Sequence, residues 1–515
     1  MILDLRELAD QSHLRADLCI IGGGPAGIAL ARRFTAGPRQ VLVLESGGLE
    51  LEADAQELNR GEVRGERYFD LRLPRQRVFG GTSVHWTGEM GVLGEVDFAA
   101  RPWQAYPGWP IAREEVASRY AEALEICGGS AWPRNPAGDP ALFRRDPMPP
   151  GGAHRLELRY RQRRAAGPRR FGTHYRDELA ASRSVRVVLH ANATELVAEP
   201  GGGHVRELVV RTLGGRRATV AARAFVLACG GLENPRLLLL SNRVEPRGLG
   251  NRHDQVGRCF QEHPVVEVAQ VFGFAESLAR VAGPIAGSPV LLPDLCPSAE
   301  LVTRERLQQF GIELAPAGEP VWDLDRRQRD GTRRFVADAA RLLPWLTNEI
   351  DESGSRRPGG LPAMKRARLD SMQEMAPDPA CRVTLGEERD ALGCRRLVLD
   401  LRLGAEFRRT LAAAARALVH ELGRFSIGRV APSAWTAPGF DGEIPWRGAA
   451  HHLGTTRMSD DPARGVVDRD CRVHGVDNLW IAGSSVFPAS GYVNPTLTIV
   501  ALALRLAEHL EARLP

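Results

Sequence analysis

The sequence has almost no lysine and no strong excess of either charge. Lys365 is the only lysine among 68 lysine and arginine residues, and the formal net charge of the 515-residue chain is +5. We interpret this skew as a bias in composition that carries no function. The basic run at residues 159–170 has Tyr160 as its sole aromatic residue. Such a run is typical of a solvated face and not of a nucleic-acid site, with a patch that steers an anionic substrate as the alternative.

Long apolar runs and clustered cysteines are also missing. No stretch approaches the roughly 20 apolar residues of a membrane span, and residues 1–15 mix charged residues with leucine where a leader would be apolar. The eight cysteines are scattered singly, which predicts reduced, structural thiols. The sequence has no set of histidine, cysteine and carboxylate residues at the spacing of metal ligands, so we predict no metal site. We therefore expect a cytoplasmic protein without a membrane or nucleic-acid partner.

The composition is that of a globular protein, with 43% hydrophobic and 25% charged residues, and the length allows two or three domains. Residue patterning predicts strands at residues 17–21, 41–44, 185–189, 205–211 and 218–229, helices at residues 113–126, 173–182, 237–241 and 406–422, and a loop at residues 128–152. The middle third has charge-dense segments at residues 323–334 and 351–357 but no glycine-rich phosphate loop. This third is therefore expected to bind substrate.

The first predicted strand runs directly into a glycine-rich turn, which has the sequence Gly22-Gly23-Gly24-Pro25-Ala26-Gly27. In a strand-turn-helix unit, Gly22 allows the tight turn, Gly24 lets the backbone approach a pyrophosphate, and Gly27 permits close packing of helix on sheet. Free amides at the start of the helix would then hold the phosphates. Glu45 follows the second strand, where its carboxylate can accept hydrogen bonds from an adenosine ribose. These features together predict dinucleotide binding.

With these motifs and those near the other end of the chain, the sequence resembles the glucose-methanol-choline (GMC) flavoprotein oxidoreductase family. The resembling pieces are residues 22–27, Glu45, and residues 80–86, 227–236, 256–258, 262–264 and 451–510. Their motifs are nearest to sugar-oxidising members such as pyranose oxidases. The resemblance implies FAD as cofactor. It also implies an α/β, Rossmann-like FAD-binding domain in discontinuous segments, joined to an α+β substrate domain on an antiparallel sheet.

We predict that the FAD-binding domain comprises residues 1–100, 171–264 and 451–515, and the substrate-binding domain residues 101–170 and 265–450. The resemblance further implies cofactor contacts outside the glycine turn. These are expected from Gly81, Thr82, His85, Trp86, Thr87, Ala228, Gly230, Asn234, Gly483, Asn494, Pro495 and Thr496. Gly483 stands where many relatives have aspartate, which puts one cofactor contact in doubt.

His451 is the predicted catalytic base, because the resembling family places such a histidine three residues before a glycine, here Gly454. Alcohol oxidation removes a hydroxyl proton as well as a hydride, and an imidazole that titrates near neutral pH suits the proton. The neighbouring His452 is the alternative base. We interpret His263, which precedes Pro264, as structural.

Asn494 is the predicted partner of His451. Proline at the first helical position makes Asn494 an expected N-cap, and the positive end of that helix would face the flavin. Asparagine can hold a substrate hydroxyl but cannot share the proton transfer. A cap without substrate contact is the alternative.

The resemblance suggests that His85 is bonded covalently to the flavin, although a simple packing contact at this position is equally open. The resemblance to pyranose oxidases also implies that Thr87 reaches the hydride-accepting nitrogen, and Trp86 is expected to pack. The predicted function is oxidation of a CH-OH group of a sugar, glycoside or polyol. The alternatives are oxidation of a sterol-like or other apolar secondary alcohol, and a non-redox lyase that uses FAD as a scaffold. The electron acceptor (oxygen, quinone or a redox protein), the oligomeric state and the exact substrate stay open.

Overall fold

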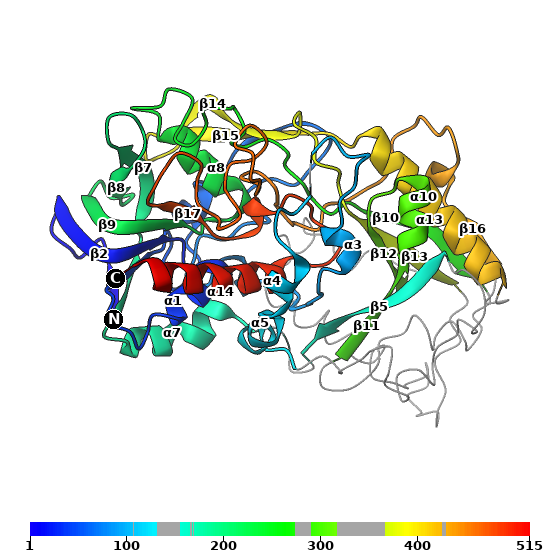
Figure 1. Ribbon diagram of the computed structural model, residues 1–515, viewed down its shortest axis with the longest axis horizontal. Coiled ribbons are helices and arrows are strands. Elements are labelled where there is room, and N and C mark those ends of the chain that lie inside the picture. Colours follow the sequence, from blue (N-terminus) through cyan, green and yellow to red (C-terminus); the bar gives the residue numbers. More distant parts are fainter. Residues whose placement is uncertain are drawn as a thin grey trace.

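The computed structural model describes residues 1–106, 108–130, 155–164, 167, 169–272, 290–316, 366–424 and 429–514. Most of the predicted loop at residues 128–152, and both charge-dense segments at residues 323–334 and 351–357, lie outside the described residues. Within this part of the chain, two large sheets lie toward opposite ends of the long axis, as Figure 1 shows.

The first sheet has eight strands in the order β1-β6-β3-β2-β9-β8-β7, and β17 pairs with β9. Its strands are β1 (Ile2–Asp4), β2 (Ser12–Ile21), β3 (Val41–Leu44), β6 (Val185–Leu189), β7 (Asn192–Ala198), β8 (Val205–Arg211), β9 (Arg217–Leu227) and β17 (Leu479–Ile481). Neighbouring strands among β1, β6, β3, β2 and β9 pair in parallel, and so do β9 and β17. Strands β7, β8 and β9 form an antiparallel meander. Strand β3 is entirely apolar and β6 is apolar except at Arg186, which suits a parallel sheet that is covered on both faces.

Helices from both halves of the chain pack beside this sheet. These are α1 (Pro25–Arg32), α4 (Arg113–Ala117), α5 (Tyr120–Cys127), α7 (Phe171–Ala181) and α14 (Thr496–Arg513). The long C-terminal helix α14 lies alongside α1 and α5, and in Figure 1 it crosses the centre of the molecule. Its leucine and alanine face is buried in the same core as β2 and β3. The C-terminal segment therefore completes the domain that the N-terminal segment begins.

Two predicted helices differ from the observed ones. The helix predicted at residues 113–126 is split into α4 and α5 at Ser118 and Arg119. The helix predicted at residues 237–241 begins earlier, as α8 (Gly230–Leu240), with Pro235 inside it. The side chain of Asn234 accepts a hydrogen bond from the backbone N–H of Cys229 at 2.8 Å, which holds the strand-to-helix turn and lets the helix start directly after β9.

The second sheet is antiparallel and has six strands in the order β16-β10-β13-β12-β11-β5. They are β5 (Leu156–Arg163), β10 (Val265–Phe272), β11 (Val290–Pro297), β12 (Phe310–Pro316), β13 (Arg366–Gln373) and β16 (Arg429–Pro432). Helix α13 (Ala405–Arg424) covers one face, where its apolar stripe packs on Ile312, Leu369 and their neighbours. Because strand side chains alternate between faces, Glu313 and Asp370 point to the other face.

A third, three-stranded sheet has the order β14-β15-β4. It combines β14 (Arg382–Arg389) and β15 (Arg395–Leu401) with β4 (Glu62–Gly65), and therefore joins a segment predicted for the substrate domain to one predicted for the FAD domain. All strands of the first sheet lie within residues 1–100, 171–264 and 451–515, and all strands of the second lie within residues 101–170 and 265–450.

The remaining short elements are α2 (Ala53–Glu57), α3 (Glu95–Phe98), α10 (Ala299–Glu305), η1 (Gly81–Val84), η2 (Ala434–Thr436) and η3 (Ser484–Val486). All eight cysteines are free thiols, as the sequence predicts. Among the described residues, the structure contains no helix whose length and hydropathy would suffice to cross a bilayer.

Candidate active site

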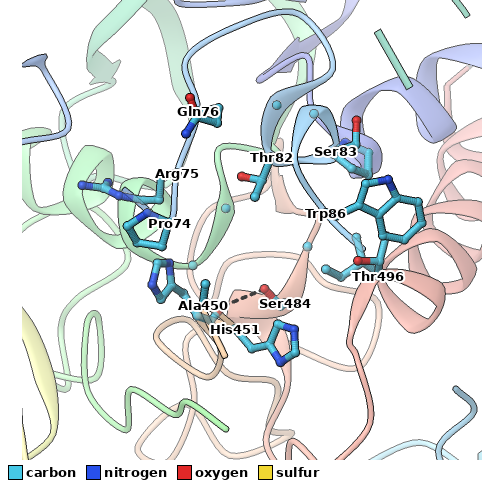
Figure 2. Close-up of a pocket in the computed structure, with 18 of the residues that line it drawn as sticks. Pro74, Arg75, Gln76, Thr82, Ser83, Trp86, Ala450, His451, Ser484 and Thr496 are labelled. Carbon is cyan, nitrogen blue, oxygen red and sulfur yellow. Dashed lines mark hydrogen bonds between the residues drawn. The ribbon is translucent and has the colours of Figure 1, made fainter. Parts of the chain in front are cut away.

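A cavity of about 370 Å³ is lined by residues of both large sheets and by the segments that join them. Most residues predicted from the sequence line it, although they come from distant parts of the chain. The predicted residues on its wall are Gly22, Gly24, Pro25, Ala26, Glu45, Gly81, Thr82, His85, Trp86, Thr87, Ala228, Gly230, His451, Gly483, Asn494, Pro495 and Thr496. In Figure 2, Thr82 and Ser83 lie above the cavity, Pro74 and Arg75 on one side, and Trp86 and Thr496 on the other.

The glycine turn after β2 is built so that two of its glycines cannot be replaced. Gly22 has a φ of 115°, and a Cβ atom on it would lie 2.4 Å from the carbonyl oxygen of Ala228. A Cβ atom on Gly27 would lie 1.9 Å from the carbonyl oxygen of Gly22. Gly27 therefore lets helix α1 pack closely against the turn, which is the packing role predicted from the sequence. It does not line the cavity.

Other glycines border open space. A Cβ atom on Gly24 would have only the Cα atom of Gly81, at 4.0 Å, within contact range, and one on Gly230 or Gly483 would have no neighbour within 4 Å. Helix α1 begins after Gly24 with Pro25 in its first turn and no side-chain cap. Its first amides therefore lack side-chain partners beside this space. Such an arrangement suits a phosphate.

Glu45 holds the glycine turn in place. Its Oε2 accepts a hydrogen bond from the backbone N–H of Gly23, and its Oε1 accepts one from the N–H of Gly47, both at 2.9 Å. The side chain is buried, and this burial raises the pKa of its carboxyl group. A ribose contact of Glu45 stays a prediction, and the observed contacts assign it a part in shaping the loop.

Asn234 lies behind the cavity and not on its wall. Besides its contact with Cys229, its amide donates to the hydroxyl of Ser485 at 2.9 Å. It thereby ties α8 to the segment that carries Gly483. Trp86 packs as expected, since its indole N–H donates to the carbonyl of Arg169 at 2.9 Å and its ring lies edge-on to Phe171.

His451 is half-buried on the cavity wall and pairs with a second histidine. Its Nδ1 lies 2.9 Å from Nδ1 of His263, and the two rings are nearly perpendicular. Burial, followed by the neighbouring histidines and Arg161, holds the pKa of His451 well below its usual range. The imidazole is therefore neutral at physiological pH. His263, which the sequence suggested to be structural, contacts the predicted base directly.

Glu262 fixes the backbone on both sides of this pair. Its Oε1 accepts the N–H of His263 at 2.7 Å and the N–H of His451 at 2.8 Å, and its Oε2 accepts the hydroxyl of Tyr68. The carboxyl group is fully buried, which raises its pKa to about 7. His452 also lines the cavity, but its Nε2 contacts the hydroxyl of Tyr68 at 3.1 Å.

Asn494 is not the N-cap that the sequence predicts. The N-cap of α14 is Pro495, one residue later, and no side chain caps this helix end. The side-chain Oδ1 of Asn494 instead lies 3.4 Å from Nη1 of Arg161. The helix start shifts because proline itself adopts helical angles there and Asn494 turns toward the antiparallel sheet.

Arg161 and its partners form a charged wall that the sequence did not predict. The guanidinium binds Glu89, Asp294 at 2.7 Å and Glu313 at 2.8 Å, and its side chain is only 4% exposed. The prediction of a solvated face for residues 159–170 is therefore wrong at this position. The available signal was the alternation in β5: Leu156 and Leu158 pack in the core with α13, so Arg161, three residues after Leu158, falls on the opposite face of the sheet.

Comparison with known proteins agrees with this geometry. Residues 166–265 and residues 377–503 match the N-terminal and C-terminal profiles of GMC oxidoreductase. The chain belongs to the GMC oxidoreductase family. The sequence-based predictions of this family, of FAD as cofactor and of an oxidoreductase acting on CH-OH donors are confirmed.

Relatives of this GMC oxidoreductase include the fructose dehydrogenase large subunit of Gluconobacter japonicus, 29% identical over 292 residues, which are 56% of this chain and 47% of that protein. They also include 6'''-hydroxyparomomycin C oxidase of Streptomyces lividus, 27% identical over 96% of this chain and 92% of that protein. Among solved structures, formate oxidase superposes with a TM-score of 0.57 over 98% of this chain and 99% of that one, at 18% identity. This likeness shows the shared fold, in which an FAD-binding part and a substrate-binding part adjoin.

Proposed function

We propose that this GMC oxidoreductase oxidises a CH-OH group of a sugar, glycoside or polyol, with His451 as the base. Bound FAD would supply the hydride acceptor, held by the glycine turn, the start of α1, and the walls at Thr82 and Gly483. His451 would take the hydroxyl proton, because its imidazole is neutral and lies on the cavity wall. Asn494 would orient the substrate oxygen, because its Oδ1 is engaged by Arg161 and its amide hydrogens can donate.

The observation that carries the choice of substrate is a set of charged residues that line the cavity, which we call the polar wall. Glu89, Arg161, Glu313 and Arg447 all line the cavity together with His451 and Asn494. Carboxylates accept hydrogen bonds from hydroxyl groups, and guanidinium groups donate to hydroxyl oxygens. Although these groups already form ion pairs, a polyhydroxylated ligand adds hydrogen bonds to them, whereas an apolar sterol would displace water from them without replacing its hydrogen bonds, at a cost of about 1–3 kcal/mol for each bond lost. The names of the relatives, which include a fructose dehydrogenase and an oxidase of an aminoglycoside, also support a sugar-like substrate.

The test is anaerobic mixing of the FAD-loaded protein with panels of sugars, glycosides, polyols and sterols while flavin absorbance is followed. We expect bleaching by a member of the hydroxyl-rich panels and none by sterols. Bleaching by sterols alone would contradict the substrate class. A compound that is consumed while the flavin stays oxidised would instead support the lyase alternative.

We also propose that FAD is attached covalently through His85. His85 directly follows η1 as its C-cap and lines the cavity together with Trp86 and Thr87. The test is denaturation in acid followed by gel filtration. Yellow colour that stays with the wild-type chain and is released from His85→Ala would support attachment, and release from both would contradict it.

A further inference from the structure

The hydrogen bond between His451 and His263 contains one proton, which is bonded to Nδ1 of one ring or of the other. The two Nδ1 atoms lie 2.9 Å apart. A neutral imidazole has one N–H and one bare nitrogen, so one ring must donate through Nδ1 and the other must accept. Both rings are neutral, since burial lowers the pKa of His263 to about 3 and holds that of His451 well below its usual value. Which ring donates decides whether His451 can serve as a base.

The surroundings of His263 favour His451 as the donor. The His263 ring is fully buried, and the backbone carbonyls of Ser490 and Gly491 act on it so as to favour its protonated form. Carbonyl groups accept hydrogen bonds and cannot donate them. The Nε2 atom of His263 makes no regular hydrogen bond within the described residues, so a bare nitrogen there would find no donor. A proton on Nε2 leaves Nδ1 of His263 bare, ready to accept from His451.

We propose that His263 is a positioning residue that holds His451 in the tautomer with its proton on Nδ1 and a lone pair on Nε2. This inference rests on the proposed function, in which His451 is the base. His451 lines the cavity and His263 does not, so Nε2 is the His451 nitrogen left for substrate once Nδ1 is engaged. When the substrate O–H bond breaks, its proton forms the Nε2–H bond of His451. The Nδ1–H of His451 keeps donating to His263, so no second proton moves.

The Glu262 carboxylate keeps the two rings in register. It accepts the backbone N–H of both histidines at 2.7 and 2.8 Å and is itself fixed by the hydroxyl of Tyr68. The charged and titratable groups that act on His451 are His263, His452 and Arg161, with Glu262 on its backbone. Among the described residues, His263 is thus the hydrogen-bond partner of Nδ1 of His451.

The test compares His263→Asn with His263→Leu. Asparagine can place its Oδ1 where Nδ1 of the imidazole lies and thus still accept from His451, whereas leucine fills the space without an acceptor. The first readout is the tautomer of His451, measured by nitrogen NMR on protein labelled in histidine and assigned with His451→Gln. We expect a protonated Nδ1 and bare Nε2 in the wild type and in His263→Asn, and loss of that single tautomer in His263→Leu.

The second readout is the rate of flavin reduction by the best sugar or polyol. We expect His263→Leu to lower the limiting rate of flavin reduction by about 10²-fold, with little change in the substrate concentration that gives half of this rate, and His263→Asn to keep most of the wild-type rate. A wild-type spectrum with the proton on Nε2 of His451 would overturn the proposal, as would equal losses in both variants with an unchanged tautomer. The spectrum needs no turnover, so it tests His263 even if His451→Gln proves fully active and the proposed function fails.

Discussion

The Nη1 atom of Arg161 lies 3.4 Å from Oδ1 of Asn494, which links strand β5 of the antiparallel sheet to the loop before α14. The same guanidinium binds Asp294 through two nitrogen atoms, at 2.7 and 2.8 Å. Asn494, which is predicted to orient the substrate, therefore contacts Arg161, and Arg161 at the same time forms ion pairs with three carboxylates. Arg161 therefore connects the stability of the substrate domain to the geometry of the site.

Replacing Arg161 by glutamine should destabilise the fold strongly. The change removes the cation from Glu89 and Asp294, which are both almost fully buried, and breaking a buried pair in this way costs about 3–5 kcal/mol. Urea unfolding of the FAD-loaded protein measures this loss. The control is Arg163→Gln, whose guanidinium is more exposed and lies 3.8 Å from Glu89. A loss no larger than that of the control would show that the cluster does not depend on Arg161.

His451 and His452 provide a matched pair for testing the base. We expect His451→Ala to slow flavin reduction by about 10²-fold or more, because a positioned base is lost. His452→Gln should keep most of the rate, because glutamine can still bond the hydroxyl of Tyr68 that His452 contacts. Stopped-flow absorbance under anaerobic conditions measures both. If only the His452 variant were slow, the assignment of the base would have to pass to that residue.

Glu313 is the partly exposed carboxylate of the polar wall, with 33% of its side chain accessible. Glu313→Gln keeps the shape but weakens an acceptor for substrate hydroxyls, and a hydrogen bond to a charged group contributes about 1.5–3 kcal/mol. We therefore expect KM to rise roughly tenfold or more while kcat changes little. Steady-state kinetics with the best substrate measures this, with the exposed Glu387→Gln as control. An unchanged KM would remove Glu313 from the binding surface.

The local parts of the site could be predicted from the sequence, because they depend on neighbours in the chain. Gly22 and Gly27 serve a turn and a helix within one strand-turn-helix unit, so their spacing alone indicates their roles. The position of Glu45 after β3 follows from the same unit.

The missed parts depend on pairing between distant segments. Arg161 looked like one of many exposed arginines, and only the order of β5, β11 and β12 in the sheet shows that Asp294 and Glu313 surround it. His263 is 188 residues from His451 in the chain, and no spacing rule connects them. The N-cap prediction at Asn494 was wrong by one residue: Pro495 itself takes the N-cap position, and the side chain of Asn494 contacts Arg161, which is distant in the chain.

Gly24 offers a test of the cofactor site that is independent of the reaction. Gly24→Val would place a side chain in open space beside the start of α1, where only the Cα of Gly81 lies within 4.0 Å. The fold should survive, but FAD should bind about tenfold more weakly or worse, which equals the loss of one hydrogen bond to a charged group. Titration of the apoprotein, followed by flavin fluorescence, measures this. The control is Gly423→Ala at the end of α13, where a Cβ atom has no neighbour within 4 Å. Equal affinity in both variants would place the phosphates elsewhere.

The buried histidines predict a loss of stability in acid. Burial lowers the pKa of His452 from 6.5 to about 3, so between these values the unfolded chain binds a proton that the folded chain excludes. The stabilisation is complete above pH 6.5 and declines as the pH falls toward 3, by at most about 1.4 kcal/mol per pH unit for one proton. His452→Gln lacks this group, so its free energy of unfolding should fall less steeply than that of the wild type between pH 6 and pH 4. Urea unfolding at a series of pH values measures the two slopes. Parallel slopes would mean that His452 takes up its proton without unfolding, through a solvent path into the cavity.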